Sequence, residues 1–203
     1  MPTSSAYRGR GRQQRSLDTR ARIMSAVREL LAEGTFHEST VEQVADRAGV
    51  SRATLYQHFR SRLELVDEMC DSFDANPALL ALRESVTHAD AAAALPETIA
   101  HTVVFWSSED AILRQLYGVA AIDEAAADLV ERQREDRRGE MSRLARHLRK
   151  AGVMRDDVSE RQALALLMLL TSYESYRELR HAGLSDRAAE ATLLSTAQGQ
   201  LLA

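Results

Sequence analysis

Residues 40–59 have the sequence TVEQVADRAGVSRATLYQHF, and this stretch decides how the N-terminal part of the chain folds. Thr40 is placed to cap a helix, and Gln43, three residues later, completes the spacing of a capping box. Gly49 comes after the apolar positions of that helix, where a glycine can adopt the left-handed conformation that reverses the chain. Ser51 is placed to cap a second helix. We therefore expect two short helices joined by a glycine turn.

The apolar residues of this stretch define the buried face of each helix. In the first helix they are Val41, Val44, Ala45 and Ala48. In the second helix Leu55 and Phe59 are four residues apart and therefore point to one side. The outer face of the second helix is then left to Arg52, Thr54, Tyr56, Gln57 and His58. This pattern predicts a helix-turn-helix that offers its second helix to the major groove of DNA. An ordinary helical hairpin would need the same packing but not the exposed set.

The flanking residues extend the prediction. Residues 17–33 have apolar positions every three or four residues, which predicts an amphipathic helix. Asp18 is a candidate N-cap, and Gly34 lies where a glycine ends a helix. Phe36 is expected to fill the core. Residues 1–16 are rich in Gly, Ser, Gln and Arg without periodicity, and predict a flexible basic arm that either follows DNA or stays solvated.

The charge distribution favours a nucleic-acid partner for the N-terminal third only. Residues 1–66 hold 11 arginines and 7 acidic residues, although the net charge of the 203-residue chain is −4. The remainder is therefore acidic, as expected for a DNA-binding module joined to a domain that avoids DNA. No apolar run is long enough to span a membrane, and the first residues lack the apolar core of a signal peptide. We expect a cytoplasmic protein with no membrane partner. The single Cys70 is compatible with a reducing compartment.

The rest of the chain also predicts helices, so the expected fold class is all-α. A fourth helix is expected over residues 62–74, with Cys70 as a small buried residue on it, and Asn76-Pro77 ends it. The later helices are placed at 78–88, 92–107, 109–119, 122–151, 159–182 and 186–202.

The N-terminal residues resemble the TetR family of bacterial transcriptional regulators. The likeness covers about residues 17–66 and is carried by Gly49-Val50-Ser51, then Thr54-Leu55-Tyr56 and Phe59, with a Ser-Arg entry to the next helix. Ala53 and Arg62 stand where the family often has Gly and Lys.

This resemblance implies three parts after the flexible basic arm. They are a three-helix DNA-binding domain at 17–66, a connecting helix four, and a helical effector-binding and dimerisation domain at 67–203. It further implies a homodimer that binds a palindromic operator and releases it when a small-molecule effector binds. The last two helices, 159–182 and 186–202, resemble the family's dimer interface.

Positions within the family pattern also imply individual roles. Thr40, Tyr56, His58 and Arg62 would contact the DNA backbone. Base reading would fall to Arg52, Thr54 and Gln57, since arginine suits guanine, glutamine suits adenine, and the threonine methyl can meet a thymine methyl. The full expected set of DNA-binding residues is Thr40, Ser51, Arg52, Thr54, Tyr56, Gln57, His58 and Arg62.

Large apolar and amphipathic residues in the second part are candidates for an effector pocket as a group, although plain core packing is the more common role for any single one of them. The candidates are Phe105, Trp106, Leu116, Tyr117, Met168, Tyr173 and Tyr176. The sequence alone does not divide pocket residues from core residues. An alternative is a DNA-binding protein whose C-terminal domain only dimerises or binds another protein.

A catalytic function finds little support. Glu97 and His101 are four residues apart and could share a metal ion, but no second histidine accompanies them. The sequence contains no Gly-rich phosphate loop, nucleophile elbow or cysteine cluster. We therefore expect no enzyme activity, no cofactor and no metal site.

Overall fold

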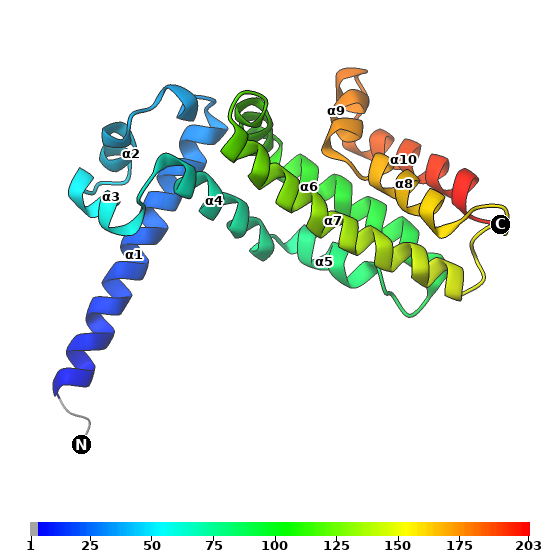
Figure 1. Ribbon diagram of the computed structural model, residues 1–203, viewed down its shortest axis with the longest axis horizontal. Helices are drawn as coiled ribbons and strands as arrows, with labels where there is room; N and C mark the ends of the chain where they lie inside the picture. The colour runs from blue at the N-terminus through cyan, green and yellow to red at the C-terminus, as the bar shows by residue number, and fades with distance from the viewer. Residues whose placement is uncertain (1–3) are drawn as a thin grey trace. The chain divides into compact units, whose positions relative to one another are not determined.

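The computed structural model describes the backbone of residues 4–203 and the side chains of residues 13–203, and these residues are helical throughout apart from connecting segments (Figure 1). Met154 and Leu202 form an isolated β-bridge. The all-α prediction is confirmed. The helices are α1 (Ser4–Ala32), α2 (Val41–Arg47), α3 (Arg52–His58), α4 (Arg62–Ser72), α5 (Pro77–Ser85), α6 (Ala91–Ala120), α7 (Glu124–Lys150), α8 (Glu160–Leu170), α9 (Tyr173–His181) and α10 (Asp186–Leu201), with 3₁₀ turns η1 (Phe36–Glu38) and η2 (Phe73–Ala75).

None of the helices in the described part of the chain is long and apolar enough to cross a membrane.

The chain forms two compact units that do not follow its linear order. The N-terminal unit runs to Asp71 and also takes in Ala111–Leu129, while the C-terminal unit consists of Ser72–Asp110 and Val130–Ala203. No local pattern in residues 111–129 indicates that this segment belongs with the N-terminal unit.

The core of the N-terminal unit forms where α1 packs on α2 and η1, and α2 packs on α3. Ile23 and Val27 of α1 are fully buried, and Phe36 of η1 is only 2% exposed. Gly34 ends α1 with a φ of +76°, and the amide of Thr35 donates to the carbonyl of Leu30 at 2.9 Å. These features confirm the predicted apolar face of α1, the glycine stop and the role of Phe36 in the core.

The start of α1 differs from the prediction. The helix begins at Ser4, so the expected start at Leu17 and the expected N-cap at Asp18 are both wrong. Asp18 lies inside the helix, where its carboxylate accepts a hydrogen bond from the Gln14 amide at 2.8 Å. Glutamine and arginine favour helix, and a pair four residues apart stabilises it, so the helix continues without an apolar face. Of the expected arm, residues 1–3 lie outside the described residues, and its contact with DNA stays a prediction.

One helix, α6, is found where two were expected. The prediction of separate helices at 92–107 and 109–119 is wrong because α6 runs through without a break. Serines at the expected break do not cap a new helix. Ser107 donates to the carboxylate of Asp186 at 2.7 Å, and Ser108 donates to the carbonyl of Phe105 at 2.9 Å.

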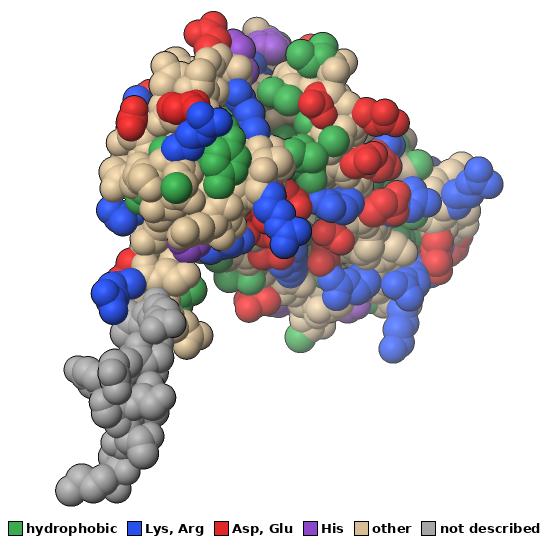
Figure 2. Space-filling model, turned by 60° about the vertical axis from the view of Figure 1, so that its left-hand side comes forward, with side chains coloured by type: hydrophobic (Ala, Val, Ile, Leu, Met, Phe, Trp, Pro, Cys, Tyr) green, Lys and Arg blue, Asp and Glu red, His purple; other side chains and the backbone are tan. Residues whose placement is uncertain are grey.

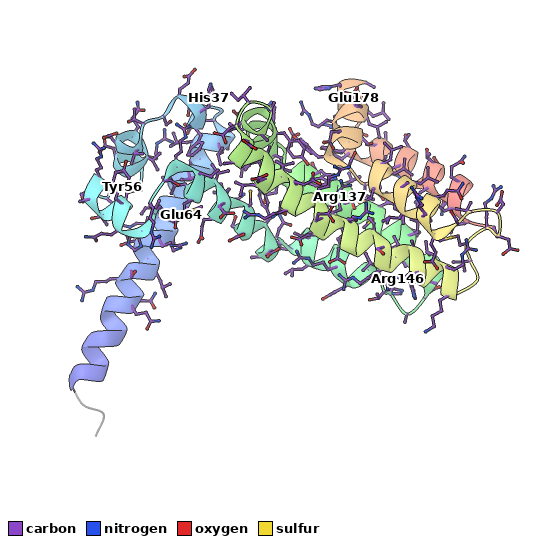
Figure 3. All side chains as sticks on the ribbon, in the orientation of Figure 1. His37, Tyr56, Glu64, Arg137, Arg146 and Glu178 are labelled. Atoms are coloured by element: carbon purple, nitrogen blue, oxygen red, sulfur yellow. The ribbon has the colours of Figure 1, made fainter. Side chains whose placement is uncertain are left out.

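The opposite difference occurs near the C-terminus, where the single helix expected at 159–182 is divided into α8 and α9. Ser172 caps α9, since its hydroxyl accepts the amide of Ser175 at 3.0 Å. Thr171, at the break, is buried, and its carbonyl accepts from Trp106 Nε1 at 3.1 Å. Arg137 of α7, labelled in Figure 3, donates to Thr171 Oγ1 at 3.2 Å. Distant side chains therefore satisfy the groups that the helix break exposes.

Candidate nucleic-acid interface

A capping box begins α2, as the sequence predicts. The Oγ1 atom of Thr40 accepts the amide of Gln43 at 3.2 Å, and the Gln43 side chain accepts the amide of Thr40 at 2.7 Å. These reciprocal bonds satisfy two amides at the helix start and hold the exposed Thr40 in one position.

Gly49 makes the turn between α2 and α3. Its φ is +63°, in the left-handed region where a Cβ is disfavoured. The amide of Val50 donates to the carbonyl of Ala45 at 3.0 Å, which closes the end of α2. The predicted glycine turn is confirmed, and it fixes where α3 begins.

The α3 helix has one buried and one exposed face. Leu55 is 1% exposed and Phe59, just after the helix, is fully buried. Ser51 caps the helix, because its Oγ accepts the amide of Thr54 at 3.0 Å and lies 2.8 Å from Thr54 Oγ1. Tyr56 is 41% exposed and is labelled on α3 in Figure 3.

Of the predicted DNA-binding residues, the structure brings the exposed Thr40, Ser51, Arg52, Tyr56 and Gln57 to the surface of α2 and α3. Thr54 and His58 are half-buried. Among the described residues, the face drawn in Figure 2 carries basic side chains interspersed with acidic ones.

Arg52 is exposed but restrained. Its side chain is 61% exposed, its guanidinium forms an ion pair with the carboxylate of Glu42, and it lies 5.5 Å from the centre of the Tyr56 ring. Hydrogen bonding to Tyr56 and the charge of Glu42 raise the pKa of Arg52 above its ordinary value. The guanidinium is therefore a permanent cation at the start of α3, held from two sides.

Arg62 does not belong to the exposed set. One of its nitrogens donates to the carbonyl of Ser39 at 2.8 Å, and another donates to the carbonyl of Phe36. Its guanidinium lies 4.3 Å from the centre of the Phe36 ring, and burial lowers its pKa. Arg62 thus joins η1 to the start of α4 through two of its five N–H donors, and its contact with a DNA phosphate stays a prediction.

Arg20 positions the end of α3, and sequence reasoning missed it. This α1 residue donates to both carboxylate oxygens of Glu68 on α4, at 2.8 and 2.6 Å. It also donates to the carbonyl of His58 at 3.4 Å and lies 4.5 Å from the centre of the Phe59 ring. Its partner Glu68 is 48 residues away along the chain, so no local pattern could identify the contact.

A second arginine ties α1 to α2. Arg47 binds both carboxylate oxygens of Glu33, at 2.8 and 3.1 Å, and lies 3.5 Å from Glu29. Like Arg20 and Arg62, it joins separate elements of the N-terminal unit to one another.

The candidate pocket residues fall in both units. Leu116 and Tyr117 belong to the N-terminal unit, whereas Phe105, Trp106, Met168, Tyr173 and Tyr176 belong to the C-terminal unit. In the C-terminal unit the aromatic rings form a continuous series from Phe73 to Tyr176. Successive centroid distances are 5.8 Å (Phe73–Phe105), 4.8 Å (Phe105–Trp106), 5.5 Å (Trp106–Tyr173) and 6.4 Å (Tyr173–Tyr176).

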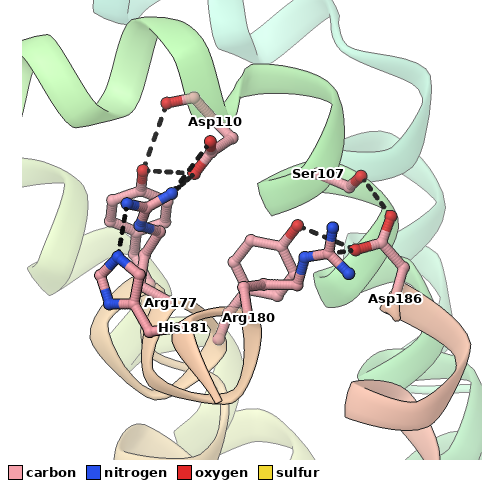
Figure 4. Close-up of polar contacts among 8 residues, drawn as sticks. Ser107, Asp110, Arg177, Arg180, His181 and Asp186 are labelled. Carbon is pink, nitrogen blue, oxygen red and sulfur yellow. Dashed lines mark hydrogen bonds and ion pairs between the residues drawn. The ribbon is translucent and has the colours of Figure 1, made fainter. Parts of the chain in front are cut away.

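The tyrosine hydroxyls of this series are occupied by two carboxylates (Figure 4). Tyr173 donates to Asp110 at 2.7 Å, and Arg177 donates to both oxygens of the same carboxylate at 3.0 and 3.1 Å. Tyr176 donates to Asp186 at 3.0 Å, and hydrogen bonding from Ser107 is the largest cause that lowers the pKa of Asp186. Burial raises the pKa of Tyr176. The aromatic residues therefore build the junction of α6, α9 and α10.

A separate open groove of the C-terminal unit is lined by charged residues, and the aromatic series does not line it. Its lining consists of Asp74, Arg83, Glu135, Asp136, Gly139, Glu140, Arg143 and Arg146. Within the described residues, no three His, Cys, Asp or Glu side chains are grouped closely enough to hold a metal ion.

Comparison with known families identifies the N-terminal part. Residues 23–69 match the family model described as bacterial regulatory proteins of the tetR family. These residues include α2, the glycine turn, α3 and most of α4. This stretch of the chain is therefore similar to the matching domain of TetR-family regulators. The resemblance read from the sequence is confirmed.

Curated relatives match mostly through the same TetR-type domain. The chain is 42% identical over 48 residues to the transcriptional activator FasR of Mycolicibacterium smegmatis, which covers 24% of this chain and 22% of FasR. It is 34% identical over 68 residues to UidR of Escherichia coli, a third of each chain, and 28% identical over 125 residues to YdeS of Bacillus subtilis, covering 60% and 58%. The chain thus spans between 22% and 58% of the length of these relatives.

Solved structures share the fold over nearly the whole chain. A TetR-family regulator from Rhodococcus has a TM-score of 0.70 at 19% identity, covering 88% of this chain and 96% of that one. SmeT, the repressor of a multidrug efflux pump of Stenotrophomonas maltophilia, has a TM-score of 0.70 at 16% identity, covering 92% and 93%. This chain therefore shares its fold with these proteins both in the N-terminal helices and in the helices that follow them.

Proposed function

We propose that the chain is a sequence-specific DNA-binding transcriptional regulator that acts in the cytoplasm. The observation that carries the proposal is the two-sided α3 helix, which buries Leu55 while exposing Arg52, Tyr56 and Gln57. A helix that only served packing would not need three exposed side chains of this kind beside a glycine turn. The TetR-type domain that contains α3 supports the same function.

The exposed residues suggest how DNA is bound. Arg52 reads guanine, and Gln57 reads adenine, in the major groove. Tyr56, Ser51 and Thr40 contact the backbone, which fixes the register of α3 without reading sequence. Thr54 and His58, being half-buried, make smaller contributions.

We infer that the regulator works as a homodimer through α8, α9 and α10. These helices pack on one another, and α10 exposes small and polar residues suited to close approach of a partner helix. Two-fold symmetry would place two α3 helices in major grooves about 34–36 Å apart, so the operator would be palindromic. Sedimentation at micromolar concentration tests this inference, and a monomer would contradict it.

The central test is a selection followed by affinity measurements. The chain would enrich duplexes from a randomised library, and anisotropy titrations would compare the enriched duplex with random DNA. Arg52→Ala is expected to weaken binding by about 1–3 kcal/mol, with relaxed selectivity at one base pair. Arg138→Ala, which removes an exposed arginine of α7, is the matched control and should change neither affinity. Equal losses on both DNAs for Arg52→Ala would remove the base-reading role.

A small-molecule effector is the second part of the proposed function. SmeT has also been solved in complex with triclosan. That structure shares the fold of this chain with a TM-score of 0.68. Trp106 is the sole tryptophan of the chain and lies within the aromatic series of the C-terminal unit, so its fluorescence reports binding there. We propose that an apolar aromatic effector binds beside Phe105, Trp106 and Tyr173 and releases the operator.

The effector test combines two readouts. A compound that changes Trp106 fluorescence and lowers the affinity for the operator supports release. Linkage then requires that operator DNA lower the affinity for the compound by the same factor. Compounds that leave operator affinity unchanged favour the alternative, in which the C-terminal unit only dimerises or binds a protein. FasR is an activator and SmeT a repressor, so a promoter fusion measures the direction of regulation.

A further inference from the structure

Glu42 introduces a negative charge into the surface that the proposed function gives to DNA. It is the second residue of α2, its side chain is 48% exposed, and its carboxylate forms an ion pair with the guanidinium of Arg52. The two residues come from different helices of the helix-turn-helix. A carboxylate at this place repels the phosphates of DNA, so the presence of Glu42 there needs an explanation.

The ion pair restrains the side chain that reads guanine. A free arginine has about 2 kcal/mol of rotamer entropy to lose when it is fixed. Arg52 is held by Glu42 on one side and lies over the Tyr56 ring, 5.5 Å from its centre, on the other. A guanidinium has five N–H donors, so it can keep Glu42 and still donate two hydrogen bonds to guanine. Restraint before binding favours the base contact.

The same pair weakens contacts that carry no sequence information. On DNA without guanine at the contacted position, the charge of Arg52 is already balanced by Glu42, which is ionised at neutral pH. The pKa of Glu42 is lowered by its own backbone amide first and by the charge of Arg52 among the other causes. Arg52 then gains little from a phosphate, and Glu42 repels it.

We propose that Glu42 is a positioning residue that sets sequence discrimination, because it aligns Arg52 for guanine and keeps Arg52 from pairing with a phosphate. This inference rests on the proposed function, because it assumes that α3 reads DNA. It concerns the ratio of operator to random-DNA affinity rather than operator affinity alone.

The test uses the full chain, the duplex enriched by the wild type from a randomised library, and a random duplex of equal length. Glu42→Gln removes the charge and keeps the shape. Asp46→Asn is the matched control, since it removes one exposed negative charge from α2 without touching the Arg52 pair. Both substitutions are repeated in an Arg52→Ala background. Each protein is titrated with both duplexes at several salt concentrations.

We expect Glu42→Gln to bind random DNA more tightly and to lower the discrimination ratio by about tenfold, in the range of one bidentate base contact. The salt slope on random DNA should steepen by about 0.9, as for one added phosphate contact. Asp46→Asn should leave the ratio unchanged, and Glu42→Gln should not alter the ratio further in the Arg52→Ala background.

Two results would overturn the inference. One is an unchanged ratio for Glu42→Gln in the otherwise wild-type chain, and the other is the same change of ratio with and without Arg52, which would mean that Glu42 contacts bases itself. A library from which the wild type enriches no sequence would instead overturn the proposed function.

Discussion

Two short helices of this chain, α3 and α9, have similar side chains and use them in opposite ways. Both carry tyrosine and arginine and are capped by serine. In α9, Tyr173, Tyr176 and Arg177 bind carboxylates from other helices of the same unit. In α3, Tyr56 and Arg52 remain exposed. The comparison shows that residue type alone does not mark a binding surface. The side chains of α9 are tied to other helices, whereas Tyr56 and Arg52 stay exposed even though Arg52 pairs with Glu42 of α2.

The largest expected effect on the α3 region comes from a substitution in its buried face. Phe59→Ala should reduce the free energy of unfolding by about 3–5 kcal/mol, because Phe59 is fully buried and its loss leaves a cavity beneath Arg20. Urea unfolding followed by circular dichroism measures this change.

Phe73→Ala is the matched control in the C-terminal unit, where Phe73 is 2% exposed. It should destabilise the chain to a similar degree. At a temperature where both variants are folded, only Phe59→Ala should weaken DNA binding, since Phe59 fixes the end of α3. Equal DNA affinity of the two variants would show that the Phe59 site does not position the helix.

The α9 region can be destabilised by removing one carboxylate, that of Asp110. Asp110→Ala leaves the Tyr173 hydroxyl and the Arg177 guanidinium without this acceptor, and should lower the free energy of unfolding by about 1–3 kcal/mol. Asp74→Ala is the control, because Asp74 forms an exposed ion pair with Arg83 that is worth about 0–1 kcal/mol. Operator affinity of folded Asp110→Ala should equal that of the wild type. A loss no larger than that of Asp74→Ala would contradict the structural role of the network.

The contrast also explains which parts of the molecule could be predicted from sequence. The Thr40–Gln43 box, the Ser51 cap and the Gly49 turn depend on residues within five positions of one another, so local patterns predict them. The exposed face of α3 follows from the same spacing.

Contacts between distant residues were missed for a physical reason. The position of Arg62 predicts a phosphate contact, but no local pattern indicates that it also binds carbonyls 23 and 26 residues earlier. The division of α8 from α9 depends on Trp106, 65 residues before Thr171. An apolar run that continues through a helix break gives no periodic signal of the break.

The smallest expected effect concerns pH and the Arg20–Glu68 pair, which joins α1 to α4. Hydrogen bonding from Arg20 is the main cause that lowers the pKa of Glu68. Because the pKa is lower in the folded state, the stabilisation is fully present above the pKa of the unfolded carboxyl, about 4.3, and is lost as the pH falls through the folded pKa. Both side chains are about one-third exposed, at 36% and 30%, so the pair should contribute at most about 1 kcal/mol.

Glu68→Gln tests this effect, with Asp67→Asn on the same helix as a charge-matched comparison. The wild type should be more stable than Glu68→Gln at pH 7, and the difference should shrink when urea unfolding is repeated below the folded pKa of Glu68. A difference that stays constant across this range would mean that the Glu68 charge does not contribute to stability. Since Arg20 also binds the carbonyl of His58, Glu68→Gln should in addition loosen the end of α3, seen as faster amide exchange there. No such change is expected in α9, whose arginines keep their own carboxylates.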